Sequence, residues 1–240
     1  MGTCGGRCPT DHCDIRTALM APMRDPESPP EQAVVPCAVL TELAGSTVRD
    51  IDTTKPLVEV QAKPPRQETA RRRMDLLEPW RHRVVRPFIR GRFLDLACGY
   101  NNLTRAHGSG LGADIFPWAG IDIRIGDAAY LPFRDSSFDT VSVIAALNHI
   151  PNREAALLAV MRILRPKGRF LATMIGPLTG RVAHLLFHQD EARRGGMRRG
   201  EVDGISPPAM RTLLRETGFE LVREVPFQLG LNRLYVARKP

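Results

Sequence analysis

Three aspartates, Asp95, Asp114 and Asp127, stand in or directly after successive short apolar segments of this 240-residue chain. Asp114 follows Asp95 by nineteen residues, a spacing at which an acid at a strand end can accept both hydroxyls of a ribose. Asp127, which precedes the small residue Ala128, can accept a purine amino group. One such acid is often a cap or a turn former, whereas three in succession favour an adenosine-sized ligand.

The turn after Asp95 indicates which kind of adenosine derivative would fit. It runs from Ala97 to Asn102 and contains one glycine, Gly99. A nicotinamide dinucleotide would call for G-x-G-x-x-G beside its pyrophosphate, and the chain has no P-loop motif either. The sequence therefore favours a nucleoside that carries no phosphate.

A sheet is needed to bring these residues together. Seven segments have the apolar or alternating patterns of strands: 92–97, 110–114, 121–125, 138–146, 169–174, 220–226 and 232–237. The segment 138–146 is almost continuously apolar after its start, which is typical of a central strand buried on both faces. Only five residues separate the last two segments, so we expect an antiparallel hairpin at one edge of the sheet.

A helical pattern precedes the first strand, from Glu68 to Ile89. Pro79 and Pro87 divide it into two short helices or one kinked helix. The apolar residues expected on its buried face are Leu77, Trp80, Val84 and Phe88.

Two further helices are expected after the N-cap candidates Asn152 and Ser206, and the first of them should stop at Pro166–Gly168. Alternating strands and helices predict right-handed crossovers. The predicted fold class is α/β, a doubly wound, mostly parallel seven-stranded Rossmann-like sheet with the antiparallel C-terminal hairpin at its edge.

Residues 1–65 differ in composition from the rest, because they hold nine of the twenty prolines and show no sustained period. We expect them to be a disordered or poorly ordered leader. Their Cys4, Cys8 and Cys13, with His12 beside them, could bind a metal or be incidental cysteines of a flexible tail. The spacing fits neither a zinc pair nor a common iron–sulfur run, so no metal site is predicted.

The chain has a net charge of +8, and most of its basic residues are arginines. Nine of these arginines lie in the range from Arg66 to Arg92. This block could contact phosphate groups, but a solvated basic helix explains it better, and no nucleic-acid-binding motif accompanies it. No apolar run approaches about 18 residues, and no secretory signal is visible. We therefore expect a cytoplasmic protein without a transmembrane segment, and peripheral contact with a membrane is an alternative for its basic surface.

The central segments resemble class I S-adenosylmethionine-dependent methyltransferases, in particular the type 11 branch that includes quinone-biosynthesis enzymes. Residues 93–99 resemble the first motif of that family, and residues 112–114 its ribose-binding acid. Residues 126–141 provide the most specific match, and residues 164–170 are similar to the loop before its fifth strand. The resemblance covers about 90–175 well, is looser to residue 240, and does not include the first 65 residues.

The resemblance implies that residues 66–240 form a methyltransferase domain that binds S-adenosylmethionine as its cofactor. The residues implied to contact the cofactor are Asp95, Ala97, Gly99, Asn101, Asp114, Asp127, Ala128 and Asn148. The family usually has glycine at the positions of Ala97 and Asn101. Asparagine tolerates left-handed backbone, but its side chain would crowd the methionine end of the cofactor or bond to it.

His149 follows the fourth strand where the family faces its methyl donor, and its ordinary pKa suits a general base. It could equally be satisfied by backbone groups and shape the loop. Beyond the fifth strand, residues 176–204 combine an apolar patch with a basic tract. They suit an apolar acceptor with an anionic group, although an ordinary surface loop would look much the same.

The predicted function is methyl transfer to an unidentified small molecule, which could be apolar and lipid-like or quinone-like. One alternative is a catalytically silent protein of the same fold that binds partners through its basic helix. Nucleic-acid methylation is a further alternative. The sequence identifies neither the acceptor nor the oligomeric state.

Overall fold

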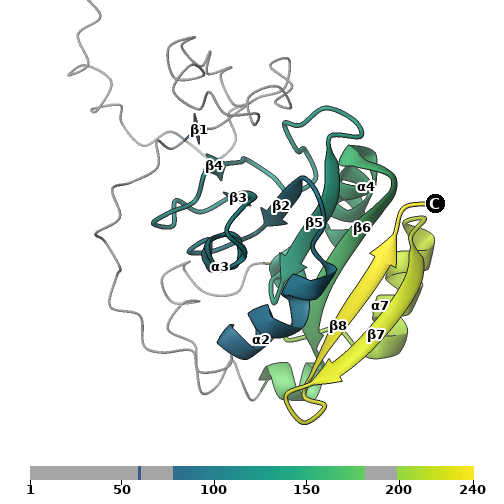
Figure 1. The fold of residues 1–240 in the computed structure, drawn as a ribbon. Coiled ribbons are helices and arrows are strands. Elements are labelled where there is room, and N and C mark those ends of the chain that lie inside the picture. Colours follow the sequence, from purple (N-terminus) through teal and green to yellow (C-terminus); the bar gives the residue numbers. More distant parts are fainter. Residues whose placement is uncertain (1–58, 61–77, 182–198) are drawn as a thin grey trace, which may run out of the picture. The chain divides into compact units, whose positions relative to one another are not determined.

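The computed structural model describes residues 59–60, 78–181 and 199–240, which form a single mixed sheet with helices on both faces (Figure 1). The strands are β1 (Glu59–Val60), β2 (Phe93–Leu96), β3 (Leu111–Asp114), β4 (Ile123–Arg124), β5 (Phe138–Ile144), β6 (Leu164–Ile175), β7 (Glu220–Phe227) and β8 (Asn232–Arg238). Their order across the sheet is β1-β4-β3-β2-β5-β6-β8-β7. All seven predicted strands are present, which confirms the α/β fold class.

The path of the chain reverses at the centre of the sheet. It moves from β2 to β3 and β4 in one direction, and then returns to place β5 and β6 on the other side of β2. These five strands are parallel. The reversal lies between β2 and β5, and in open α/β sheets ligands bind outside the carboxyl ends of the strands at this point.

The predicted C-terminal hairpin is confirmed, because β7 and β8 pair antiparallel at one edge. The reversed strand is β8, which lies one place in from the edge and also pairs antiparallel with β6. At the opposite edge the short strand β1 pairs antiparallel with β4. This eighth strand falls within residues 1–65, and its sequence had no recognisable strand pattern.

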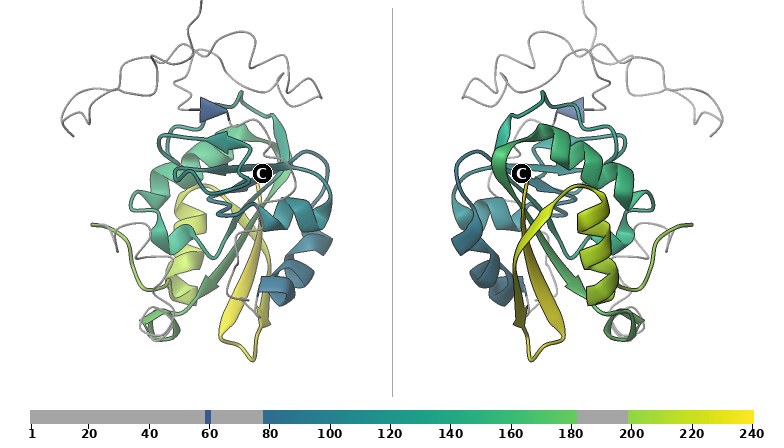
Figure 2. Two further views of the ribbon diagram at one scale, coloured as in Figure 1. Left: turned by 90° about the vertical axis from the view of Figure 1, so that its left-hand side faces the viewer. Right: turned by 90° about the vertical axis from the view of Figure 1, so that its right-hand side faces the viewer.

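The helices lie in two layers, one on each face of the sheet (Figure 2). They are α2 (Glu78–Val85), α3 (Asn102–His107), α4 (Arg153–Ile163) and α7 (Pro207–Glu216), with 3₁₀ turns η3 (Arg86–Phe88) and η4 (Leu147–His149). The buried apolar residues of α4 and α7 belong to the larger core cluster with the inner strands. Val85 and Leu103, from α2 and from α3, belong to a second cluster on the other face.

The predicted helical segment is divided near Pro87, since α2 ends at Val85 and η3 begins at Arg86. Pro79 lies in the first turn of α2 and does not divide it, and residues 68–77 lie outside the described residues. The predicted buried face was wrong in one respect. Trp80 is 45% exposed, whereas Val85 and Ile89 are buried. Val85 and Ile89 pack in the second core cluster, so the buried face is turned by one residue from the predicted one.

The expected loop between α4 and the next strand does not exist. The helix ends at Ile163 and β6 begins at Leu164, so Pro166–Gly168 lies inside the strand as an irregularity in its pairing with β5. Lys167 adopts a φ of +64°. Its backbone N–H donates to Lys239, whose own N–H donates to Gly168, and these bonds keep the distorted stretch in the sheet.

The two predicted N-caps have different outcomes. Ser206 caps α7 by accepting a hydrogen bond from the backbone N–H of Ala209 at 3.4 Å. Asn152 occupies the N-cap position of α4, but its side chain makes no capping hydrogen bond.

Several features singled out in the sequence lie outside the described residues. They are Cys4, Cys8, His12 and Cys13, Leu77, the arginines 66 and 71–73, the apolar patch 182–187, and Arg193, Arg194 and Arg198. Within the part of the chain that the structure describes, no helix combines the length and apolarity needed to cross a membrane.

The turn after β2 is left-handed at alternate residues. Ala97, Gly99 and Asn101 have φ values of +56°, +54° and +57°. The expectation that Asn101 can hold a turn of this kind is confirmed. Left-handed backbone costs roughly 1–2 kcal/mol for a residue with a Cβ, so other contacts must hold this turn in place.

Asn101 supplies such contacts through its buried side chain. Its Nδ2 donates to the Gly120 carbonyl at 2.9 Å and to Asp122 Oδ2 at 2.8 Å. Its Oδ1 accepts from the Thr104 hydroxyl. The amide also fills the space where a Cβ on Gly112 would stand. Asn101 therefore joins the start of α3 to β3 and to the segment before β4.

We expect Asn101→Ala to lower the free energy of unfolding by about 1–2 kcal/mol, because the Gly120 carbonyl loses its donor, whereas Asp122 keeps the Gly112 N–H and Thr104 keeps the residue-101 carbonyl. Asn101→Gly loses the same bonds but relieves the left-handed strain, so it should be about 1 kcal/mol more stable than the alanine variant. Urea unfolding of the three proteins measures both differences. If the two variants were equally stable, this would contradict a left-handed backbone conformation at residue 101.

Candidate functional site

A cavity of about 610 Å³ lies outside the carboxyl ends of β2, β3 and β5, and we call it the main cavity. Eight of the nine residues predicted to form the site line it: Asp95, Ala97, Gly99, Asp114, Asp127, Ala128, Asn148 and His149. The ninth, Asn101, does not. The expectation that its side chain would enter the site was wrong, because Gly112 leaves room for that side chain on the β3 side.

Asp114 ends β3 with its side chain buried at the wall of the main cavity. One carboxylate oxygen accepts the backbone N–H of Gly99 at 2.9 Å, and the other accepts that of Phe116 at 2.9 Å. These bonds attach the turn after β2 to the end of β3. Because each carboxylate oxygen has two lone pairs, Asp114 can still accept hydroxyl groups from a ligand.

Asp127 and Ala128 lie beyond the end of β4, on the same cavity as Asp114. Asp127 is exposed, and its Oδ1 accepts the backbone N–H of Ala129 at 2.8 Å, which holds the carboxylate in a fixed direction. On the β2 side, Gly99 has no atoms within 4 Å of where a Cβ would stand. The backbone at Gly99 is thus open to close approach by a ligand.

Asp95 lies in β2 and is buried, with 2% of its surface exposed. Burial raises the pKa of Asp95 to about 7, the hydrogen bond from Ser142 opposes this change, and the nearby charge of Asp114 adds to it. Two neighbouring carboxylates in a low-dielectric site repel each other. A positively charged group in the main cavity would offset this repulsion.

Cys98 also lines the main cavity. Burial raises the pKa of its thiol well above the ordinary value, and the charges of Asp95, Asp114 and Asp122 act in the same direction. This shift favours the protonated thiol, and since the thiolate is the reactive form, the surroundings of Cys98 disfavour a role as nucleophile.

Two groups of lining residues were missed by sequence reasoning. Tyr100, Phe116 and Trp118 bring aromatic rings to the cavity, with the centroids of Tyr100 and Trp118 separated by 5.2 Å. They follow β2 and β3 within a few residues of the predicted acids. Aromatic residues close to these two strand ends were thus a sequence signal that could have identified them as lining residues. Such rings supply flat apolar surface for a ligand.

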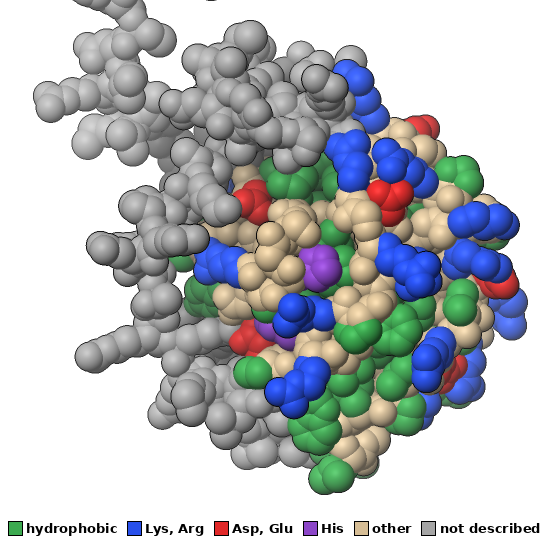
Figure 3. All heavy atoms as spheres, in the orientation of Figure 1, with side chains coloured by type: hydrophobic (Ala, Val, Ile, Leu, Met, Phe, Trp, Pro, Cys, Tyr) green, Lys and Arg blue, Asp and Glu red, His purple; other side chains and the backbone are tan. Residues whose placement is uncertain are grey.

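The second missed group comes from α2, which contributes Glu78, Arg81 and His82 to the lining. Glu78 Oε1 accepts from Asn102 Nδ2 at 3.0 Å and lies 3.6 Å from His82 Nε2. Figure 3 shows histidine side chains at the surface in the region of α2 and the end of β5. The spacing i, i+3, i+4 places these residues on one helical face, a signal that the sequence contained.

His149 lies in η4, directly after β5, between two side chains. Its Nδ1 is 3.1 Å from Glu201 Oε2, and its Nε2 is 3.2 Å from Asn148 Nδ2. Asn148 is also bonded to the segment that follows Glu201, because its Nδ2 donates to the Val202 carbonyl at 3.2 Å. Glu201 was not predicted, since it lies 52 residues from its partner in the sequence.

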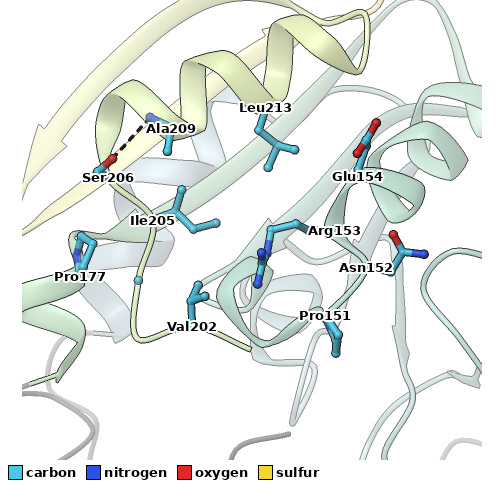
Figure 4. A pocket seen from close by; sticks show the side chains of 11 residues that line it. Pro151, Asn152, Arg153, Glu154, Pro177, Val202, Ile205, Ser206, Ala209 and Leu213 are labelled. Carbon is cyan, nitrogen blue, oxygen red and sulfur yellow. Dashed lines mark hydrogen bonds between the residues drawn. The ribbon is translucent and has the colours of Figure 1, made fainter. Parts of the chain in front are cut away.

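A second cavity of about 520 Å³ adjoins the main one and shares Pro151 and Asn152 with it. In Figure 4 the Arg153 side chain points toward the segment that carries Val202 and Ile205. An Arg153 guanidinium nitrogen donates to the Gly200 carbonyl, which holds that segment against the start of α4. None of the predicted site residues lines this cavity, so we take the main cavity as the functional site.

Comparison with known proteins shows which family this chain resembles. The family model described as a methyltransferase domain matches residues 94–172. A demethylmenaquinone methyltransferase from Thermus thermophilus is 26% identical over 198 residues, which cover 67% of this chain and 90% of that protein. A ubiquinone/menaquinone biosynthesis C-methyltransferase from Blochmanniella pennsylvanica is 36% identical over 61 residues, which cover 25% of this chain and 24% of that protein.

The fold has counterparts among solved structures. A methyltransferase from Thermotoga maritima, described as S-adenosylmethionine-dependent and possibly acting on histamine nitrogen, aligns with a TM-score of 0.51 at 16% identity. The alignment covers 69% of this chain and 96% of that one. The likeness concerns the fold, since the sequences have diverged widely.

We expect Asp95→Asn to change how stability depends on pH. The folded protein keeps a proton on Asp95 up to about pH 7, where its raised pKa lies, whereas an unfolded aspartate releases its proton near pH 3.9. The folded state therefore binds more protons between these values, and the wild type should lose up to about 1.4 kcal/mol per pH unit as pH rises through this window.

Asparagine does not titrate, so the variant should lose less stability than the wild type over the same window. Urea unfolding at about pH 5 to 8 measures the difference, with Asp135→Asn as the control because the Asp135 side chain is 75% exposed. Parallel curves for wild type and Asp95→Asn would contradict the raised pKa.

Proposed function

We infer that this chain, which belongs to the class I S-adenosylmethionine-dependent methyltransferases, binds S-adenosylmethionine in the main cavity and transfers its methyl group to a small-molecule acceptor. The observation that carries this inference is the convergence of Asp114 and Asp127, from neighbouring strand ends, on one cavity at the switch point. We further propose that residues 66–240 form the methyltransferase domain, to which β1 adds an edge strand from within the segment 1–65 predicted to be a leader.

The main cavity fits the cofactor in size and in chemistry. Its volume of about 610 Å³ lies within the range of 300–1,000 Å³ typical of small-molecule sites. We propose that Asp114 accepts the ribose hydroxyls and that Asp127, beside Ala128, accepts the purine amino group. The rings of Tyr100 and Trp118 offer flat surface for the adenine ring of the cofactor. The open backbone at Gly99 leaves room for the rest of the cofactor.

When bound, S-adenosylmethionine supplies a methyl group on a positively charged sulfur. The negative charge of Asp114 and the acidic Asp95 favour a cation in the main cavity. The principal task of the chain is to orient the acceptor and exclude water, which can contribute about 7–11 kcal/mol to lowering the barrier. We propose that His149 removes a proton from the acceptor as general base.

The acceptor that we propose is apolar and quinone-like or lipid-like. Relatives with measurable sequence identity are named for ubiquinone, menaquinone and demethylmenaquinone. The main cavity that His149 lines also has apolar lining, which suits a ring without charge; it is provided by Ile144, Ile150, Met174 and Ile175.

Titration calorimetry with S-adenosylmethionine tests the cofactor assignment. We expect Asp114→Ala to weaken binding about 10–100-fold, because it removes charged hydrogen bonds worth about 1.5–3 kcal/mol. Asp135→Ala is the matched control, since this aspartate forms a surface ion pair with Arg162. If the wild type does not bind the cofactor at high-micromolar concentration, the proposed function is wrong, and the alternative of a catalytically silent protein of the same fold holds.

Methyl transfer is tested with cofactor that carries an isotopically labelled methyl group and a cell extract as the source of acceptor. Mass spectrometry should find the label in an apolar small molecule. His149→Gln should lower the rate of label transfer about 10²-fold or more, while the cofactor Kd changes less than about twofold. Label found in nucleic acid, or equal rates for the variant, would contradict the proposal.

A further inference from the structure

The imidazole of His149 is held by two side chains that act on different ring nitrogens. Glu201 Oε2 lies 3.1 Å from Nδ1, and Asn148 Nδ2 lies 3.2 Å from Nε2. Which nitrogen of a neutral histidine carries the proton depends on the hydrogen bonds that each nitrogen makes. The chemistry of the two partners therefore selects the tautomer.

The direction of the Asn148 amide is fixed by a third contact. Its Nδ2 lies 3.2 Å from the carbonyl oxygen of Val202, which can only accept a hydrogen bond. The nitrogen of the amide must therefore face Val202, and its second hydrogen is available to His149. Nε2 accepts that hydrogen and so carries a lone pair.

Glu201 requires the same tautomer from the other side. Its side chain is 3% exposed, and burial of a carboxylate is costly unless a donor compensates it. An ionised carboxylate only accepts hydrogen bonds, so Nδ1 carries the proton and donates it to Glu201. Both contacts thus place the proton on Nδ1 and the lone pair on Nε2.

We propose that Glu201 is a positioning residue that keeps Nε2 of His149 as the proton acceptor in the main cavity, and that the methyl acceptor carries an O–H or an acidic C–H group. The part about the acceptor rests on the proposed function. The O–H or C–H bond of the methyl acceptor breaks, and its electron pair stays on the oxygen or carbon. The proton moves to Nε2 of His149. The acceptor then replaces Asn148 as the partner of Nε2.

The position of Glu201 also suits the charge that this step creates. Protonation of Nε2 turns the imidazole into a cation, and a buried carboxylate 3.1 Å from Nδ1 stabilises that cation. An amine acceptor in its neutral form has a lone pair of its own and needs no base to attack. A buried acid–base pair beside the cavity therefore favours phenolic, enolic or carbon-acid acceptors.

Nitrogen NMR of the full chain with ¹⁵N-labelled histidine tests the tautomer without any reaction. The chain has six histidines, and loss of one signal set in His149→Gln assigns the residue. At about pH 8 we expect Nδ1 of His149 to be protonated and Nε2 to be unprotonated. A wild-type spectrum with the proton on Nε2 would overturn the proposal, whatever the variants do.

Glu201→Gln tests the role of the carboxylate. We expect the proton to move toward Nε2, because the glutamine amide can donate to Nδ1, and the label-transfer rate to fall about 10²-fold or more. Glu201→Asp should restore the wild-type tautomer and much of the rate. Glu216→Gln, which changes an exposed glutamate on α7, is the matched control and should leave both unchanged.

The outcomes separate the two proposals. A cofactor Kd that stays within about twofold in Glu201→Gln shows that the cavity is intact, so a lower rate then reports on His149. Absence of label transfer in the wild type would refute the proposed function, while the tautomer could still be as expected. A wild-type rate in Glu201→Gln, or label transferred to an amine, would overturn this inference and leave the cofactor assignment standing.

Discussion

The main cavity depends on one buried carboxylate that is bonded to backbone. Asp114 accepts N–H groups from Gly99 and from Phe116, so it holds the turn after β2 and the loop after β3 against the end of a central strand. That turn needs left-handed backbone at alternate residues, which would be strained in isolation. Asp114 and the Asn101 side chain together hold this turn, so the chain's own contacts fix the backbone that lines the cavity on the β2 side.

The same constraint has an electrostatic consequence. Burying Asp114 close to Asp95 raises the free energy of the charged forms, and the protein compensates through Ser142, through backbone donors and through a pKa of about 7 for Asp95. A site that holds acidic groups in this way accepts a cation more readily than an anion. A nucleoside with a positively charged sulfur matches this balance, whereas a phosphate-bearing dinucleotide does not.

The fold and most of the site could be predicted because their signals are local. Strands are visible as short apolar runs, and Asp114 and Asp127 stand where such runs end, so topology alone brings them together. What could not be predicted depends on contacts across the chain. The Asn101 amide turns away from the cavity because Gly112 leaves space on an adjacent strand. The partner of His149 lies 52 residues away, and the pairing of β1 with β4 has no sequence pattern.

The separation of Glu201 from the strand ends that we propose to bind the nucleoside has a consequence for how proteins of this fold diverge. Residues 95–128 build the part of the cavity that we assign to the cofactor, whereas the carboxylate beside His149 arrives from beyond β6. The residue at position 201 can therefore change during evolution without altering the hydrogen bonds that Asp114 and Asp127 make to the backbone. On the proposed function, two related proteins that share residues 94–172 could then methylate chemically different compounds. One would have a carboxylate beside the histidine at position 149, and the other would lack it.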